Sequence, residues 1–362
     1  MIKTTCLLFE ENTTNMKKLT LALFIGISVS TFFSCKKKSI TEPTASTPSS
    51  TASDASASNE LDRVYSDIET VYNSQQYQDT TVNPNARTTA AILPCGIVSL
   101  NKRNFTITYG GVNCGSRVLS GSIAVTLIKG NLFSDSGAVL KIVYNNYQVL
   151  YYANNQSITY NGTSYVTNAT GGALLTLFTG ALNVKLSHRV RANLALTYDT
   201  TGKGNANVTR AWNVFRLNTY TNTNGSATGI TLTITGDTSI AANTYITGTA
   251  IYSSASEYGI SRDGYNFVCN LTTPFYWANC GTDYSGPYIL QHGQLDYSMD
   301  LSKSVLAAYA TSGKWSAIAG YDYVSATQYN FIGSCSANGY KICDSLFKNN
   351  TVVLSASSFQ PY

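Results

Sequence analysis

Apolar and polar residues alternate along most of the chain beyond Pro94, and this period of two constrains the fold more than any other feature of the sequence. Side chains of a strand point to its two faces in turn, so an alternating segment predicts a strand with one buried face. Clusters of Gly, Asn, Asp and Thr at 161–162, 201–202, 224–225 and 263–264 predict turns between the segments. The segments cover 104–109, 120–127, 139–152, 156–160, 191–198, 213–220, 229–234, 245–252, 265–271, 289–297 and 315–323. We therefore expect an all-β fold, with a large, mostly antiparallel sheet or sandwich.

The segment from Asn59 to Gln75 has a different period. Its apolar residues recur every three or four positions, and Ser58 or Asn59 can cap the start of a helix. These residues are Leu61, Val64, Tyr65, Ile68, Val71 and Tyr72. We expect one amphipathic helix of about four turns, docked on the β domain by this stripe.

The residues from Met16 to Cys35 have the order of a secretory signal, with two lysines, an apolar stretch and the small Ser34 before a cysteine. They resemble the signal of bacterial lipoproteins, in which that cysteine receives lipid and becomes the mature N-terminus. The resemblance implies that Cys35 is lipidated. The alternative is an uncleaved membrane anchor, because residues 19–35 reach the lower limit of about 17 residues needed to span a bilayer. Either reading predicts export of the remaining chain.

The start of the chain predicts further divisions. Glu10 and Glu11 fit a positively charged signal start poorly, so we expect Met16 to be the first residue and 1–15 to be a misassigned start. Ser, Thr, Ala and Pro dominate 35–58, which predicts a flexible tether. The expected organisation is a signal peptide at 16–34, the tether at 35–58, a helix and connector at 59–94 and the all-β domain at 95–362.

The charge of the chain bears on its location and partners. The formal net charge is +5, and beyond Cys95 the basic residues are spread without a run. A nucleic-acid-binding protein has a concentrated basic face, so we expect no nucleic-acid partner. The lipoprotein signal implies an anchor in the outer membrane, and the periplasmic and the surface face both remain open. The membrane is therefore the first expected partner, through the lipid.

Six cysteines follow Pro94, an even number in a chain that is expected to be exported. This predicts disulfides, with 15 possible pairings. Neighbours in sequence flank predicted turns, where the Cα atoms of two cysteines can approach closely enough for a bridge. The local couples are Cys95 with Cys114, Cys269 with Cys280, and Cys335 with Cys343. Zinc sites use closely spaced cysteine or histidine pairs, which this chain lacks, so we expect no metal and no cofactor.

Short motifs around these cysteines carry a family resemblance. They are Cys95, ITYGGVNCG at 107–115, Arg117, SGSIAV at 120–125, and Cys343-Asp344 ahead of a terminal strand. This arrangement resembles a group of uncharacterised Bacteroidetes lipoproteins over roughly Cys95 to Leu354. The resemblance implies a cysteine-rich all-β domain in the cell envelope and carries no activity. Where members of the group typically have Gly-Asp-Gly before the final Cys-Asp, this chain has 336–339 as SANG.

The sequence offers little for catalysis. It contains no nucleophile elbow, metalloprotease helix, P-loop or dinucleotide fingerprint, and only Glu257 and nine aspartates supply carboxylates after Cys95. Turn-forming or solvated aspartates are the more common explanation for such residues. We expect a non-enzymatic protein. The alternative is an Asp-dependent glycan hydrolase that uses residues from Asp263, Asp283, Asp296, Asp300 and Asp322.

Aromatic residues beside Asn and Thr are the remaining candidates for a site. Flat rings and amide donors suit a sugar, although aromatic residues of a sheet more often pack against their neighbours. The candidate binding residues are Tyr151, Tyr152, Trp212, Tyr276, Trp277, Trp315, Tyr321 and Tyr323. We expect an envelope component that binds a glycan or another envelope protein, or that has a structural role without a small ligand.

Overall fold

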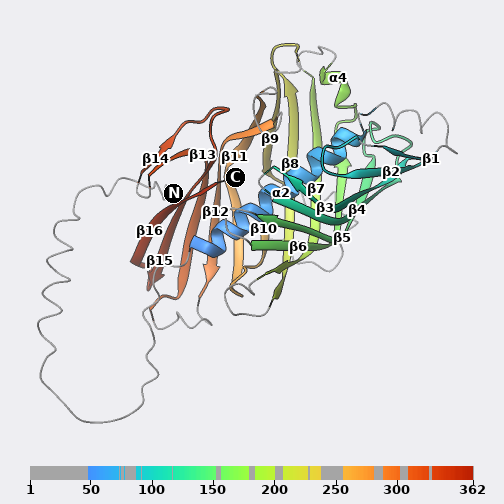
Figure 1. Ribbon diagram of the computed structural model, residues 1–362. Helices are drawn as coiled ribbons and strands as arrows, with labels where there is room; N and C mark the ends of the chain where they lie inside the picture. The colour runs from blue at the N-terminus through green and yellow to red at the C-terminus, as the bar shows by residue number, and fades with distance from the viewer. Residues whose placement is uncertain are drawn as a thin grey trace, which may run out of the picture. The chain divides into compact units, whose positions relative to one another are not determined.

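In the computed structural model, sixteen strands of the described chain join in one sheet (Figure 1). The structure describes residues 48–72, 74, 77, 87–90, 92–115, 117–151, 156–178, 184–199, 207–226, 229–237, 256–280, 288–301, 309–325 and 328–361. The strands are β1 (Arg87–Ala90), β2 (Ile97–Asn101), β3 (Asn104–Cys114), β4 (Arg117–Lys129), β5 (Val139–Tyr151), β6 (Gln156–Asn168), β7 (Lys185–Tyr198), β8 (Val208–Asn222), β9 (Ile230–Gly236), β10 (Glu257–Ile260), β11 (Asn266–Asn279), β12 (Tyr288–Asp300), β13 (Ser312–Ser325), β14 (Gln328–Phe331), β15 (Gly339–Lys348) and β16 (Thr351–Pro361). Among the described residues, the helices are α2 (Pro48–Tyr72) and α4 (Leu175–Phe178).

The sheet is antiparallel throughout its described pairs, and its strands follow each other in chain order from β1 to β8. Two short strands, β9 and β10, share the space between β8 and β11, each pairing with both long strands. The order then continues through β12, β13 and β15 to β16, while β14 pairs with β13. The predicted all-β class with a large antiparallel sheet is confirmed.

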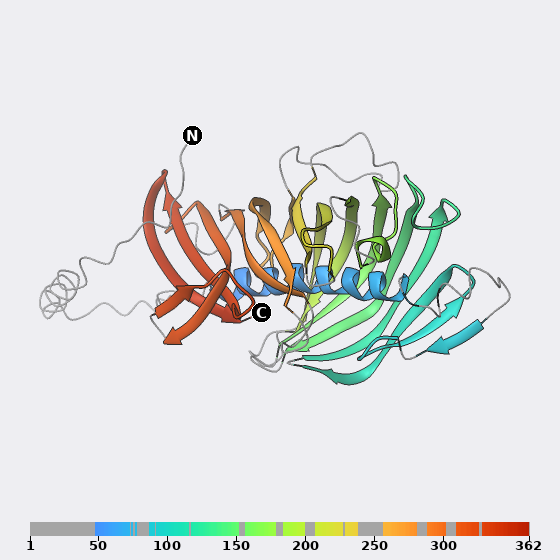
Figure 2. The same cartoon turned by 90° about the horizontal axis from the view of Figure 1, so that it is seen from above.

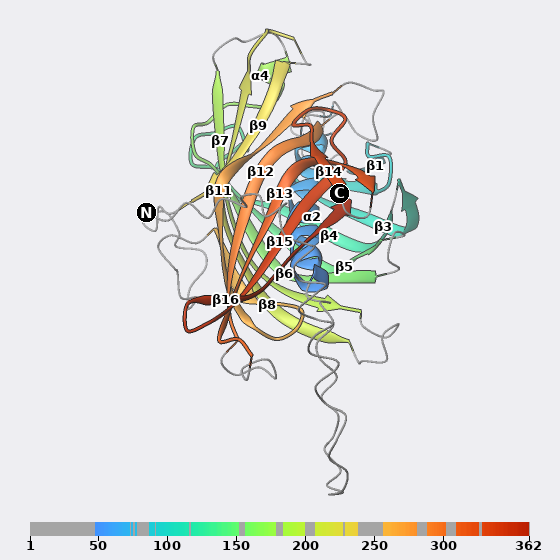
Figure 3. The same cartoon turned by 90° about the vertical axis from the view of Figure 1, so that its left-hand side faces the viewer.

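The curved sheet encloses helix α2. Figure 2 shows α2 crossing the strands, and Figure 3 shows strands on several sides of it. At one end, α2 lies close to β13, β15 and β16. At its other end, the helix reaches β3, where Tyr72 packs against Phe105 with ring centroids 5.3 Å apart. The helix therefore lies inside the domain rather than on its surface.

The helix begins earlier than its sequence period predicts. Residues 48–58 are helical, so the predicted boundary between a flexible tether and a helix at Asn59 is wrong. Ala57 and Ser58 are completely buried, because small side chains let the helix approach the sheet closely. Pro48 at the first helical position is favourable, since its ring fixes a helical φ and the missing N–H would lack a partner there.

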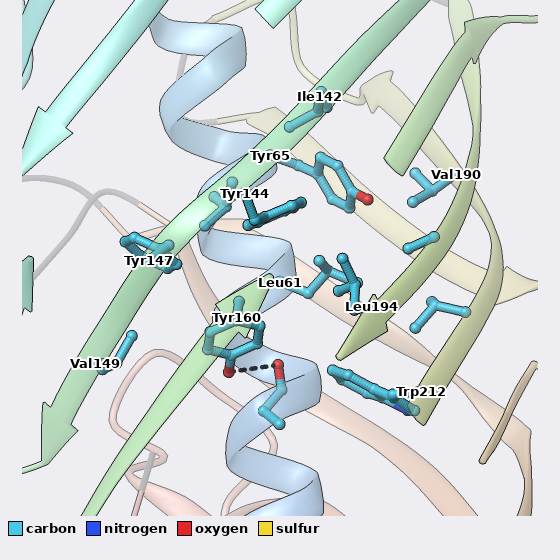
Figure 4. Packing of buried hydrophobic residues seen from close by; sticks show 14 of the residues in the cluster. Leu61, Tyr65, Ile142, Tyr144, Tyr147, Val149, Tyr160, Val190, Leu194 and Trp212 are labelled. Atoms are coloured by element: carbon cyan, nitrogen blue, oxygen red, sulfur yellow. Dashed lines mark hydrogen bonds between the residues drawn. The ribbon is translucent and has the colours of Figure 1, made fainter. Parts of the chain in front are cut away.

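Tyrosines account for much of the core between helix and sheet. Tyr144, Tyr147 and Tyr160 are fully buried on β5 and β6 and surround Leu61 and neighbouring residues of α2 (Figure 4). The Tyr160 hydroxyl donates a hydrogen bond to the Ala57 carbonyl over 3.2 Å. A tyrosine buries a large apolar ring and still satisfies its hydroxyl, so it suits an interface between a sheet and a partly polar helix.

The predicted strands agree with the structure wherever it describes them, and 245–252 lies outside the described residues. One predicted turn is wrong. Asn161 and Gly162 lie within β6, opposite a register shift in β5, and the Gly162 φ is 127°. A Cβ at Gly162 would lie 2.5 Å from the Asn193 carbonyl oxygen, so glycine serves close strand approach here instead of a turn. The turns at 224–225 and 263–264 are confirmed, and 201–202 is outside the described residues.

The sheet also begins before the predicted domain boundary at Cys95. Strand β1 pairs with β2 through four residues, Arg87 to Ala90, within the segment expected to be a connector. None of the helices in the described part of the chain is long and apolar enough to cross a membrane.

Of the three predicted disulfides between cysteines that are neighbours in sequence, one is confirmed. Cys95 and Cys114 are bonded, joining the start of β2 to the end of β3. Cys280 is bonded to Cys335, 55 residues away in the chain, so the predicted couples of Cys269 with Cys280 and of Cys335 with Cys343 are wrong. Cys269 and Cys343 remain buried thiols. Cys269 lies within β11 and faces the core, whereas Cys280 follows the end of that strand, so the two cannot meet.

Candidate functional site: an exposed aromatic patch

The three tryptophans do not form a binding platform. Trp212 on β8, Trp277 on β11 and Trp315 on β13 are only 2%, 8% and 3% exposed. The Trp212 indole donates a hydrogen bond to Glu257 over 3.1 Å, which fixes the ring inside the core. The expectation that these residues belong to a ligand-binding surface is therefore wrong, because each occupies the inward face of its strand.

Three of the tyrosine candidates lie apart from each other or outside the described residues. The Tyr151 hydroxyl donates a hydrogen bond to the Ser56 carbonyl over 3.3 Å and so packs against α2. Tyr276 stacks on His292 with ring centroids 4.9 Å apart, on neighbouring strands β11 and β12. Tyr152 is outside the described residues.

The last two candidates, Tyr321 and Tyr323, lie in a cluster of rings on the outer face of the sheet. The cluster also contains Tyr329 and Phe331 of β14 and Phe359 of β16, and we call these five residues the aromatic patch. Ring centroids are 5.4 Å apart for Tyr321 and Phe331, and 5.6 Å apart for Tyr323 and Phe359. Tyr323 is 52% exposed and Phe331 is 58% exposed, so the patch faces solvent.

Strand register gathers these rings on one face. Tyr321 pairs with Phe331, and Tyr323 pairs with Tyr329, so the four rings share one side of the β13–β14 hairpin. In the first part of β13 alternate residues such as Trp315 and Ala317 point inward, and the register of β13 against β15 then shifts between Ala319 and Tyr321.

Gly320 stands at this register shift. Its φ is 99°, and a Cβ there would lie 2.3 Å from the carbonyl oxygen of Gln291 on β12. Only glycine tolerates both conditions. The irregularity that separates the buried half of β13 from its exposed aromatic half therefore depends on this glycine.

Several bonds hold the patch in place. The carbonyl of Gly320 accepts hydrogen bonds from the amides of Ile332 and Gly333 over 2.8 and 3.1 Å. The Tyr329 hydroxyl donates to the Ser357 carbonyl of β16 over 3.3 Å. The disulfide of Cys280 with Cys335 fastens the connection between β14 and β15 to the end of β11. A surface fixed in this way loses little conformational freedom when a ligand binds.

One cation accompanies the rings. The ammonium of Lys341 on β15 lies 5.8 Å from the Tyr321 ring centroid, within reach of a cation–π contact. Lys341 pairs with Phe359 across β15 and β16 and so lies on the same face as the patch. The patch thus offers flat apolar surfaces, the exposed rings of Tyr323 and Phe331 and one positive charge. Exposed clusters of apolar side chains are often found at interaction sites of proteins.

The aspartates proposed for catalysis form no pair among the described residues. Asp296 accepts hydrogen bonds from Thr272, Gln294 and Ser316, as a structural carboxylate does. Asp300 is four residues further along β12, about 13 Å away at the rise of a strand, whereas the two carboxyl groups of a glycosidase are about 5 to 9.5 Å apart.

The other three aspartates are separate as well. Asp263 is exposed in a turn, and Asp322 accepts a hydrogen bond from the Asn338 amide. Asp283 is outside the described residues. No group of His, Cys, Asp and Glu in the described part of the chain could hold a metal ion.

A buried ionic network, which the sequence did not predict, holds α2 within the sheet. Arg216 of β8 is fully buried, donates a hydrogen bond to Asp62 over 2.5 Å and also contacts Glu257 and Ser58. Two carboxylates thus share one guanidinium. Burial raises the pKa of Asp62 from 3.8 to about 6, against the attraction of Arg216. Burial lowers the pKa of Arg216, but Asp62 and Glu257 outweigh it and raise the pKa overall.

A second set of contacts lies further along the helix and sheet. Arg117 of β4 pairs with Glu60, which also accepts a hydrogen bond from the Tyr147 hydroxyl over 2.5 Å. The Tyr109 hydroxyl donates to Asp67 over 2.9 Å, and burial raises the pKa of this carboxyl to about 6. These contacts join α2 to β3, β4 and β5 and fix the helix on the sheet.

Comparison of the chain with protein families, with characterised proteins and with solved structures finds no match.

Proposed function

We propose that the protein is a non-enzymatic binding component of the cell envelope, anchored by lipid at Cys35, and that its aromatic patch binds a glycan. The observation that carries the proposal is the gathering of five aromatic side chains from three strands on one outer face, with Tyr323 52% and Phe331 58% exposed. Isolated exposed apolar residues are ordinary, but a contiguous and fixed cluster is not.

The chemistry of the patch favours a sugar over a purely apolar ligand. Sugar rings present C–H faces that stack on aromatic rings, and their hydroxyls bind polar neighbours. Tyr323 and Tyr329 contribute rings with hydroxyl groups, and Lys341 adds a donor at the edge of the patch. The described patch is a surface without an enclosing cavity or paired carboxylates, which suits binding without turnover.

A glycan array tests this proposal. The full chain with Cys35→Ser, which removes the lipid acceptor, is compared with the same chain carrying Tyr323→Ala and Phe331→Ala. Loss of the two rings is expected to weaken glycan binding by about tenfold or more, because exposed aromatic anchors dominate such contacts. Ile97→Ala with Ile128→Ala, which removes exposed apolar side chains elsewhere on the sheet, is the matched control and should bind normally.

Three results would overturn the proposal in whole or in part. Equal binding by the patch variant and the control would place the site elsewhere. Cleavage of the bound glycan would overturn the non-enzymatic reading. A wild-type chain that binds no glycan but retains an envelope protein through the same two rings would replace the glycan by a protein partner.

The anchor is tested separately. Metabolic labelling with a radioactive fatty acid is expected to label the wild-type chain and not the Cys35→Ser variant. A wild-type chain without label, or a variant labelled as strongly as the wild type, would contradict lipidation at Cys35.

A further inference from the structure

Strand β16 is the last strand in the order of the sheet and forms one of its edges. Its residues pair with β15 over Gly339 to Lys348, and no described residue pairs with its other side. The backbone amides and carbonyls of that side form a template on which another strand can form hydrogen bonds. One carbonyl of β16, that of Ser357, already accepts a hydrogen bond from the Tyr329 hydroxyl.

The sequence of β16 does not protect this edge. Its eleven residues, TVVLSASSFQP, contain no Asp, Glu, Lys or Arg, and the only proline stands at the end. Val352, Val353 and Leu354 are each between 40% and 53% exposed. Edge strands of monomeric proteins are usually short, charged or interrupted by proline, because an unprotected edge associates. A long edge strand without charges and with three exposed aliphatic side chains is therefore expected to have a partner.

A second copy could also pair head to tail, with its strand β1 against β16, but β1 at the opposite edge of the sheet is a poor partner. Strand β1 has only four residues, and its first is Arg87. Pairing β16 with β1 of another copy would leave most of β16 uncovered and would extend without closing. Antiparallel pairing of β16 with itself uses its whole length and closes as a symmetric dimer.

A two-fold axis at Ala356 also gives complementary side chains. In this register Val353 lies opposite Phe359 of the second copy, and Leu354 lies opposite Ser358. An aromatic residue opposite a β-branched one is a favourable cross-strand pair. The strand carries no charge, so no like charges meet in this register.

We propose that β16 pairs with β16 of a second copy of this chain, giving a symmetric dimer with one continuous sheet. The dimer does not rest on the proposed glycan binding. If both hold, the aromatic patches of the two copies lie on the same outer face, on either side of the shared edge, because Phe359 belongs to both features. Two patches would then bind one long glycan with an avidity that neither has alone.

The oligomeric state tests this inference. The full chain with Cys35→Ser is studied by sedimentation velocity over a dilution series, where a reversible dimer is expected. Ser355→Lys with Ser357→Lys places lysines opposite each other twice in the proposed register and should give monomers. Ile97→Lys with Ser99→Lys, at two exposed alternate positions of the interior strand β2, is the matched control and should still dimerise.

A variant with the opposite charges tests whether the lysine variant is monomeric because it has misfolded. Ser355→Glu with Ser357→Glu should also be monomeric alone and should form a heterodimer when mixed with the lysine variant. Ala356→Cys, on the two-fold axis, should form an intermolecular disulfide under oxidising conditions. A wild-type chain that stays monomeric throughout, a lysine variant that dimerises like the control, or a mixture without heterodimers would each overturn the proposal. Loss of dimerisation with glycan binding retained would leave the proposed function standing.

Discussion

The guanidinium of Arg216 on β8 donates a hydrogen bond to Asp62 of helix α2 over 2.5 Å, across 154 residues of sequence. Both side chains are buried, and Glu257 of β10 contacts the same guanidinium. The helix is thus fixed inside the sheet by charge as well as by apolar packing.

Replacement of Arg216 should strongly destabilise the domain. Arg216→Met leaves two buried carboxylates without their cation, which costs on the order of 3 to 5 kcal/mol in the free energy of unfolding. Arg189→Met is the control, because Arg189 is partly exposed and its nearest carboxylate oxygen, on Asp237, is 3.8 Å away. Urea unfolding monitored by circular dichroism measures both variants. Equal losses in the two variants would show that Arg216 is not the centre of the network.

Stability should fall as pH rises from about 4 to about 6. Burial raises the pKa values of Asp62 and Asp67 from 3.8 to about 6, so the folded chain holds protons in this range that the unfolded chain has released. Each carboxyl therefore contributes stability that is present below pH 4 and lost as pH passes 6. The loss is on the order of 2 to 3 kcal/mol for each group. Urea unfolding at several pH values between 4 and 7 measures this slope.

An amide at one of these positions separates the effect from other titrations. Asp67→Asn keeps an acceptor for the Tyr109 hydroxyl and removes one titrating group, so the slope between pH 4 and 6 should become shallower. Asp263→Asn, at an exposed turn position, is the control and should keep the wild-type slope. A slope unchanged in Asp67→Asn would contradict the buried proton at Asp67.

Disulfide mapping should separate the two ways of pairing Cys280. Digestion of unreduced protein should release a linked peptide pair for Cys280 with Cys335 and another for Cys95 with Cys114. Burial raises the pKa of the Cys269 thiol, so this thiol should react with an alkylating reagent only after unfolding. A linked peptide of Cys269 with Cys280 would refute the observed pairing.

Removal of the disulfide that closes the longer loop, Cys280 with Cys335, should loosen the β13–β14 hairpin of the aromatic patch. Cys280→Ser with Cys335→Ser frees the connection that follows β14 and is expected to lower the free energy of unfolding by about 4 kcal/mol, from the length of the closed loop. Hydrogen exchange should increase first in the β13–β14 hairpin. Cys95→Ser with Cys114→Ser, which opens a shorter loop, is the comparison and should leave exchange in that hairpin unchanged.

The sequence predicted the features that depend on local pattern. Alternation is a local property, so it located strands such as 104–109 and 289–297, and the three- to four-residue period located the apolar stripe of α2. It did not show that the polar side of α2 is buried as well. Glu60 and Asp62 look like residues of a solvated face until the sheet curves around them.

The sequence nevertheless contains signals of the buried ionic network around Arg216 and of the aromatic patch. Arg216 stands two residues after Val214 and four after Trp212, on the inward side of an alternating strand, which requires a buried partner for its charge. The tryptophans were wrong candidates because alternation alone does not say which face is inward. Tyr321 and Tyr323 were candidates as aromatic residues of a predicted strand, but Phe359 joins them only through the pairing of distant strands.

Isothermal titration calorimetry with an oligosaccharide selected on the array measures binding at the aromatic patch. The wild-type chain should bind it, the Phe331→Ala variant should bind at least about tenfold more weakly, and the Ile97→Ala control should match the wild type. The Phe331→Ala variant should also keep the wild-type free energy of unfolding, because the ring is mostly exposed. An affinity unchanged by Phe331→Ala would contradict the aromatic patch as the binding site of this protein.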